Sequence, residues 1–385
     1  MKPSLKPSLL CWIVLLCLVP STLESQDLQL PAVPRRSEPR FGVVPLKNAR
    51  SHLPEVMRQA SSGSTIPLWN YSLVSYIDGK TYSGQMVGRS PFYHGLRSTS
   101  IQAYLIPIIL TFPDGTVFNP TRTDACLGSI VKIVVANSPI FKTVGFTLNG
   151  IDMGTTQYVD AFQRANFWND ISAASDGYHT LLGSTFLPAV SVTVPSGSGQ
   201  TGSYFGCKYG YVDYSWWDGY VQNTLIPSLA ASGVGPTTLP IFYFDSVDLC
   251  DAFPSGCGIL GYHGSYYPSS VLQTYIVNDF DTSGSYGGDI SVLSHEAAEW
   301  MDDPMGTNPT PPWGHVGQVK NCQSNLEVGD PLSGTFLPAV PLNGFTYHLQ
   351  ELAFFSWFYR IPSIGAGGVF SDNGTFTGDA GPVCM

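Results

Sequence analysis

Six cysteines constrain this chain more than any other feature of its sequence. They follow an apolar leader and are Cys126, Cys207, Cys250, Cys257, Cys322 and Cys384. An even number of cysteines in an exported chain predicts disulfides, and six cysteines allow about 15 pairings. A short, turn-rich loop, residues 251–256, separates Cys250 from Cys257, so we expect these two to pair. Because no CxxC pair is present, we do not expect a zinc site built from thiolates.

The leader itself has the pattern of a secretory signal peptide. Lys2 and Lys6 precede an apolar run over residues 9–19, and Ser21 and Ser25 offer small residues for cleavage. The run is too short to span a bilayer comfortably, and no later run is long and apolar enough. We therefore expect a signal peptide at 1–25 and a secreted or periplasmic protein without a membrane span. A retained signal anchor is the alternative.

The charge balance argues against nucleic acid as a partner. The chain has 18 Lys and Arg against 28 Asp and Glu, which gives a net charge of −10 at pH 7. Binding to nucleic acid or to an anionic membrane requires Lys and Arg to neutralise phosphate, so we exclude both. With 385 residues, 43% of them hydrophobic, the chain can build one large domain or two ordinary ones.

The N-terminal part of the mature chain predicts a tail followed by strands. Residues 26–65 contain the charged, proline-flanked stretch 34–40, which fits a linker or a pro-segment with a processing site. Residues 66–154 predict a β-rich domain, in which Pro113-Asp114-Gly115 and Asn149-Gly150 are hairpin turns. The expected strands of this domain are 101–111, 117–118, 130–135 and 144–148.

Residues 155–385 mix helix and strand signals. We expect Pro227 to kink one helix and Asp289 to cap another. The expected helices are 155–170, 214–231, 290–301 and 349–359, the expected strands are 190–194, 239–244 and 272–277, and 195–203 is expected to be a flexible loop. The predicted fold class is therefore α+β, with a β-rich part followed by a mixed α/β domain that contains a short active-site helix.

The segment 294–304, Ser-His-Glu-Ala-Ala-Glu-Trp-Met-Asp-Asp-Pro, carries the clearest chemical signal. On a helix, His295 and Glu299 lie on one face and could hold one metal ion. Glu296 lies about 100° around the helix, where it can reach a metal-bound water. This is the arrangement of the HExxH metalloprotease motif with Glu in place of the second His, and carboxylate oxygen is an accepted zinc ligand.

A third ligand must come from elsewhere in the chain. Glu327 is our first choice because it is isolated in a loop rich in Gly and Pro, and Asp330, His315 and His348 follow. We therefore predict one zinc ion on His295, Glu299 and Glu327. Either His315 or His348 could hydrogen-bond the oxyanion of a hydrolytic transition state.

Structural explanations compete with these functional ones. Glu299 could lie on a solvated helix face with Asp302 and Asp303, and His295 could be a hydrogen-bonded core residue. For Gly261-Tyr262-His263-Gly264 we favour a structural loop over a ligand or substrate contact. For the pair Trp216-Trp217 we favour core packing over stacking on sugar rings.

These motifs resemble those of secreted bacterial proteins of poorly known function that are often regarded as zincin-like. The resemblance covers residues 210–385, and a fainter one reaches the plant phosphate-induced, exordium-type extracellular proteins. It rests on His295-Glu296-x-x-Glu299, Asp303-Pro304, Glu327-Val328-Gly329-Asp330, Trp313-Gly314-His315, Cys322-Gln323 and the segment 347–352. It implies a zincin-like domain at 155–385.

The expected function is that of a secreted zinc-dependent metallopeptidase, with a peptide or protein substrate and Glu296 as general base. One alternative is a non-catalytic extracellular protein that binds cell-wall glycan on the same scaffold. The other is a glycosidase that uses two carboxylates among Glu296, Glu299, Asp302 and Asp303. We favour it least, because carboxylates four residues apart on one helix do not flank a sugar from two sides.

Overall fold

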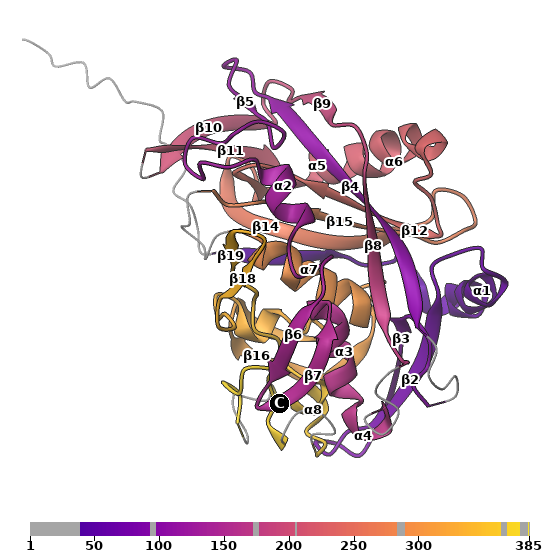
Figure 1. The fold of residues 1–385 in the computed structure, drawn as a ribbon. Coiled ribbons are helices and arrows are strands. Elements are labelled where there is room, and N and C mark those ends of the chain that lie inside the picture. The colour runs from indigo at the N-terminus through magenta and orange to yellow at the C-terminus, as the bar shows by residue number, and fades with distance from the viewer. Residues whose placement is uncertain are drawn as a thin grey trace, which may run out of the picture. The chain divides into compact units, whose positions relative to one another are not determined.

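A mixed sheet of 11 strands organises the fold (Figure 1). Its main path runs β10-β11-β13-β14-β15-β12-β4-β5, while β1 pairs with β14 and both β8 and β9 pair with β4. The structure is a computed structural model that describes residues 39–92, 98–171, 177–204, 206–282, 289–362, 368–377 and 384. The expected signal peptide lies outside the described residues.

The elements have the following bounds. The strands of the large sheet are β1 (Arg40–Val44), β4 (Thr99–Thr111), β5 (Val117–Phe118), β8 (Thr180–Phe186), β9 (Val190–Thr193), β10 (Gly199–Tyr204), β11 (Cys207–Asp213), β12 (Thr238–Tyr243), β13 (Val247–Ala252), β14 (Ser255–Tyr266) and β15 (Gln273–Asn278). Four hairpins stand apart from it: β2 (Leu68–Val74) with β3 (Thr81–Val87), β6 (Val144–Leu148) with β7 (Ile151–Thr156), β16 (Pro309–Val316) with β17 (Val319–Asn325), and β18 (Val340–Leu342) with β19 (Phe345–Tyr347). The helices are α1 (Ala49–Ser62), α2 (Val131–Ala136), α3 (Tyr158–Asn166), α4 (Trp168–Ile171), α5 (Tyr214–Tyr220), α6 (Ile226–Ser228), α7 (Ser291–Asp302) and α8 (Phe355–Tyr359).

The central strands are buried on both faces, and their successive side chains enter two different cores. Leu105, Ile241 and Ile276 pack in the core that contains α3 and α7, whereas the next residue of each strand packs in the core that contains α5. This alternation follows from the period of two in a β-strand. Figure 1 shows α3 and α7 on one side of these strands and α5 and α6 on the other. Helix α7 is therefore held between the sheet and α3.

Several predicted elements are confirmed. β4, β9, β12 and β15 match the expected strands within two residues at each end, and α7 is displaced by one residue from the expected helix. The two expected hairpin turns join β4 to β5 and β6 to β7, both antiparallel. The expected helix at 155–170 is divided into α3 and α4, and the one at 214–231 consists of α5, a π-turn, α6 and a 3₁₀ turn. Trp217 is fully buried, which confirms core packing for this residue.

Other local predictions are wrong for identifiable reasons. Residues 130–135 were expected as a strand, but Val131, Val134 and Val135 are buried and Ile133 is 51% exposed, which is helical spacing. A short β-branched run does not distinguish the two states by periodicity alone. Residues 199–203, expected within a flexible loop, belong to β10 because this segment pairs with β11. Of the helix expected at 349–359, only α8 forms. Asp289 does not cap α7, since Ile290 occupies the cap position without a side-chain bond.

The strands do not follow the expected division of the chain. Residues 40–62, expected within a linker or pro-segment, form β1 and α1, and β1 pairs with β14. β4, from the expected β-rich domain, pairs in parallel with β12 and β8 from the second one. Residues 34–385 form one compact unit. Non-local pairing of this kind has no signature in local sequence patterns.

Three disulfides join all six cysteines that the structure describes. The bridges are Cys126–Cys207, Cys250–Cys257 and Cys322–Cys384, so the pairing expected for the short loop is confirmed. Disulfides of this number fit an oxidising, extracytoplasmic compartment. Among the described residues, no helix combines the length and apolar character needed to cross a bilayer.

We predict that the Cys126–Cys207 bridge is a major contributor to stability, because it joins cysteines 81 positions apart. Replacing both with Ser should lower the free energy of unfolding by about 4 kcal/mol, the loop-closure value for a loop of this length. Denaturant titration of the oxidised proteins measures the difference. Intact mass after alkylation should show that the other two bridges remain. A loss below about 1 kcal/mol would contradict the prediction.

Candidate metal centre

Helix α7 places an unusual density of ionisable side chains inside the protein. All 12 of its residues are buried, including His295, Glu296 and Glu299 at 1% exposure or less. The solvated-face alternative for Glu299, Asp302 and Asp303 is therefore wrong, as each of these carboxylates is at most 1% exposed. Asp303 instead accepts hydrogen bonds from the backbone N–H groups of Thr307 (2.9 Å) and Asn308 (2.8 Å), which holds the turn after the helix.

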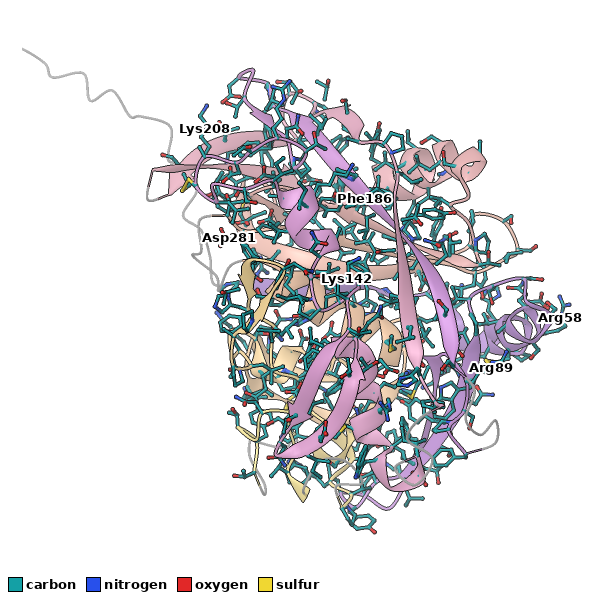
Figure 2. All side chains as sticks on the ribbon, in the orientation of Figure 1. Arg58, Arg89, Lys142, Phe186, Lys208 and Asp281 are labelled. Atoms are coloured by element: carbon teal, nitrogen blue, oxygen red, sulfur yellow. A yellow bond between two sulfur atoms is a disulfide. The ribbon has the colours of Figure 1, made fainter. Side chains whose placement is uncertain are left out.

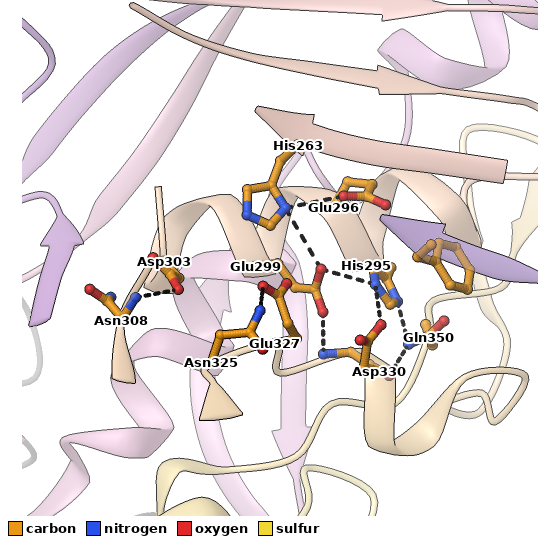
Figure 3. Close-up of polar contacts among 12 residues, drawn as sticks. His263, His295, Glu296, Glu299, Asp303, Asn308, Asn325, Glu327, Asp330 and Gln350 are labelled. Carbon is orange, nitrogen blue, oxygen red and sulfur yellow. Dashed lines mark hydrogen bonds and ion pairs between the residues drawn. The ribbon is translucent and has the colours of Figure 1, made fainter. Parts of the chain in front are cut away.

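Two segments bring further ligands to α7 (Figure 3). Strand β14 contributes His263, and the segment after β17 contributes Glu327 and Asp330. Within the described residues, three groups have ligand atoms that all lie within 4.8 Å of one another, and two of them are in this cluster: His295 with Glu299 and Asp330, and His263 with Glu296 and Glu299. The third, His315 with Cys322 and Cys384, contains the two sulfurs of a disulfide. Glu299 belongs to both groups of this cluster and is its centre.

The spacing around His295 suits a metal ion. Its Nε2 atom lies 3.1 Å from Oε2 of Glu299 and 3.6 Å from Oδ1 of Asp330. In a tetrahedral zinc site with bonds of about 2.0 Å, ligand atoms are about 3.3 Å apart. Although it is fully buried, this Nε2 atom has no hydrogen-bond partner, because the neighbouring oxygens are close but wrongly directed. An ion placed between the three atoms would satisfy all of them.

The pKa shifts of the clustered residues also favour a bound cation. Burial raises the pKa values of Glu296, Glu299 and Glu327 well above their ordinary range, and neighbouring carboxylates raise them further. Burial also lowers the pKa of His295 to about 4, so its imidazole is neutral at pH 7. The described groups that act most strongly on these carboxylates are other carboxylates and His295 rather than Lys or Arg. A divalent cation would remove this accumulation of uncompensated charge.

The basic residues near the surface do not supply that cation. Arg58, Arg89, Lys142 and Lys208, which are labelled in Figure 2, are all exposed.

Glu327 and Asp330 differ in their suitability as third ligand. An interaction with Glu299 raises the pKa of Glu327, and Glu327 accepts a hydrogen bond from Asn325 at 2.5 Å. Asp330 faces His295 directly and accepts hydrogen bonds from Gln318 and, at 3.1 Å, from Gln323. The geometry thus favours Asp330, our second choice from the sequence, for the place we expected Glu327 to take.

His315 and His348 have their described contacts outside the cluster. His315 is exposed, and its Nε2 atom lies 3.8 Å from Sγ of Cys322. That sulfur belongs to the Cys322–Cys384 disulfide, so it is no thiolate ligand. The side chain of His348 is 44% exposed, and its Nδ1 atom lies 2.7 Å from Asp289. Neither contact brings these histidines to His295 or Glu296.

Sequence reasoning underestimated His263. We expected a turn at residues 261–264, but they lie within β14, where His263 is fully buried and its Nδ1 atom is 3.3 Å from Oε2 of Glu296. The glycines on either side obscured the strand, because glycine is rare inside strands. Gly261 is needed there, since a Cβ atom would lie 2.7 Å from Val292 and 3.0 Å from Glu296 of α7.

Gln350 and Gly329 position His295; both lie in the sequence motifs above, but neither was expected to have this role. The Nε2 atom of Gln350 lies 2.8 Å from Nδ1 of His295 and 2.8 Å from the carbonyl oxygen of Gly329. A metal at Nε2 of His295 requires the proton on Nδ1, so the Gln350 amide must turn its oxygen toward Nδ1 when metal binds and give up its hydrogen bond to Gly329. Phe41 closes the other side of the imidazole, with ring centroids 3.8 Å apart and an interplanar angle of 15°.

A cavity of about 450 Å³ reaches this cluster from the surface. Its lining includes Glu299, Glu327 and Asp330 together with Phe41 and Gln318. The carboxylates are therefore accessible to a small molecule despite their burial.

Comparison with known proteins adds no relative: no family model, curated protein or solved structure matches the chain.

We predict that Gly329→Ala weakens metal binding. A Cβ atom at this position would lie 2.4 Å from Nδ1 of His295, so the imidazole must move. Displacing a ligand in this way should reduce metal affinity by about 10- to 100-fold. Competition with a chelating dye measures the affinity. Gly145→Ala is the matched control, because a Cβ atom there meets nothing within 4 Å. Equal affinity in the two variants would show that His295 is not a ligand.

Proposed function

We propose that this chain is a secreted, zinc-dependent hydrolase of peptide bonds, with His295, Glu299 and Asp330 as ligands. The observation that carries the proposal is the buried, unpartnered Nε2 atom of His295, which faces carboxylate oxygens at 3.1 and 3.6 Å. A neutral imidazole with two carboxylates is a ligand set that zinc accepts, and its three ligands leave a fourth position for water. The three disulfides support export.

Glu296 is the proposed general base. Its carboxylate is fully buried and belongs with Glu299 to one of the two ligand groups, so it lies beside the proposed ion. Its Oε1 atom has no hydrogen-bond partner, and Oε2 lies 3.3 Å from Nδ1 of His263. The raised pKa of Glu296 suits a group that accepts a proton and returns it to a leaving amine near neutral pH. Zinc, when bound, supplies Lewis acidity that lowers the pKa of its water to about 7.

His263 is the proposed orienting partner of this base. Burial lowers the pKa of His263 to about 3, so it is a neutral donor or acceptor at pH 7. It can donate from Nδ1 to Glu296 and fix the carboxylate toward the cluster.

A non-catalytic protein that binds metal and an extracellular ligand is the second candidate. It is favoured by the position of Phe41, whose ring covers His295 in the intact chain. The arrangement gives the glycosidase alternative no support. The ligand oxygens of Glu296 and Glu299 lie within 4.8 Å of each other, and those of Asp303 are bonded to backbone N–H groups.

We predict that the purified protein binds one zinc ion per chain. His295→Ala and Asp330→Ala should each abolish it, because each leaves only two of the three ligands and two ligands make a poor zinc site. Glu327→Gln should retain it, because the amide keeps a hydrogen-bond donor toward Glu299. Elemental analysis after dialysis gives the metal content. Full occupancy in His295→Ala would contradict the ligand assignment, and loss in Glu327→Gln alone would restore Glu327 as third ligand.

We predict that Glu296→Gln separates metal binding from hydrolysis. The amide keeps the shape of the side chain but cannot accept a proton, so the variant should bind metal normally. Hydrolysis of an unbiased peptide library should fall by about 10²- to 10⁴-fold. A chelator-treated sample of the unmodified protein is the control for metal-dependent cleavage. Unchanged cleavage in Glu296→Gln would remove the general-base assignment. If the metal-loaded protein cleaves nothing, either intact or with the chain cut between Lys47 and Asn48, the non-catalytic candidate replaces the hydrolase.

A further inference from the structure

Strand β1 lies where an extended peptide would reach the metal centre. It pairs in parallel with residues 259–264 of β14, and Phe41, Gly42 and Val43 stand opposite Gly261, Tyr262 and His263. On its other side, the same part of β14 pairs with β15. Without β1, residues 261–264 of β14 would present a row of free backbone N–H and C=O groups beside His263. We call residues 259–264 the β14 edge.

A single glutamine holds the backbone of β1 over the cluster. Gln318 accepts a hydrogen bond from the N–H of Phe41 at 2.6 Å and donates one to its C=O at 3.1 Å. The same amide also donates to Asp330. Contacts to the main chain recognise an extended peptide without regard to its sequence, which is how strand addition provides affinity. The side chain of Phe41 adds selectivity, because its ring stacks on His295.

Two cavities continue along β1. The cavity at the metal centre is lined in part by Val43 and Tyr214, and a second cavity of about 840 Å³ is lined by the same two residues together with Asp218 and Tyr266. The two cavities together therefore form a groove along β1 that extends beyond its five residues.

β1 is attached less firmly than the strands beside it. All five of its residues are only half-buried, whereas every residue of β15 is buried. The ion pair between Arg40 and Asp251 (2.8 Å) has side chains that are 32% and 47% exposed, and such pairs contribute little. Pro45, Lys47 and Asn48, which connect β1 to α1, are exposed. A segment with few buried contacts opens at low free energy.

We propose that the β14 edge is a binding site for an extended peptide with an aromatic side chain placed over His295, and that β1 fills this site in the intact chain. The inference rests on the proposed function, for which it names the substrate class. While β1 is in place, the Phe41 ring separates a substrate from His295.

The test uses the full chain with a site-specific protease sequence inserted between Lys47 and Asn48. Cutting there breaks the covalent link of β1 and removes no residue. A fluorescein-labelled peptide with the sequence of residues 38–46 is then added to cut and uncut protein, and fluorescence anisotropy reports binding. We expect the peptide to bind the cut protein and not the uncut one. A Phe41→Ala peptide should bind about tenfold or more weakly, because it lacks the aromatic anchor.

The proposal is overturned if the cut protein, with unchanged circular dichroism, binds neither peptide, or if it binds both equally. Should cutting unfold the protein, hydrogen exchange on the uncut chain decides instead. We expect the amides of residues 42–44 to exchange faster than those of residues 274–277 in β15. Equally slow exchange would show that β1 does not leave the edge, and would overturn the proposal.

Binding and hydrolysis are measured separately. If the peptide binds but nothing is cleaved, the β14 edge remains a peptide-binding site and the proposed hydrolase activity is wrong. If chelator-sensitive cleavage occurs without peptide binding, the hydrolase activity remains and the binding site at the β14 edge is wrong.

Discussion

The burial of Glu299 is the constraint on which the rest of the site depends. A carboxylate removed from water needs compensation, and this one has a backbone N–H, that of Gly329, at 3.1 Å. Its second oxygen faces His295 at 3.1 Å and His263 at 3.7 Å, both of which burial keeps neutral. The neighbouring carboxylates make the electrostatic problem worse. A cation that binds at this point would therefore be coupled to the stability of the whole α7 region.

Two glycines let the neighbouring chain segments approach α7 closely enough to form the cluster around Glu299. Gly261 lets β14 lie against α7, and Gly329 lets the loop after β17 lie against the His295 ring. At either position a methyl group would displace a side chain of the cluster. The two glycines thus determine how near the three chain segments can come, while Gln350 and Gln318 fix the orientation of the groups that they bring together. None of these four residues is a ligand, yet each limits where the ligands can lie.

Sequence patterns predicted the parts of the structure that are local. The helix that carries His295 and Glu299, the strands with clear β-branched runs and the Cys250–Cys257 bridge all follow from neighbours along the chain. The predictions that failed concern segments whose structure depends on partners far away in the sequence. β10 exists because β11 pairs with it, and β1 exists because β14 offers an edge. His263 was assigned to a turn because its flanking glycines suggest one, whereas they are present to let the helix approach.

The same distinction explains why the sequence does not decide between Glu327 and Asp330 as third ligand. Glu327 and Asp330 are three residues apart in one loop, so spacing from His295 along the chain does not separate them. Their environments do: Glu327 accepts a hydrogen bond from Asn325, while Oδ1 of Asp330 lies 3.6 Å from Nε2 of His295. Among the described residues, Asp330 forms a close group of possible ligands with His295 and Glu299, and no such group contains Glu327. Which carboxylate of the loop faces the imidazole thus depends on how the loop after β17 packs against α7, and this packing has no counterpart in the spacing of the sequence.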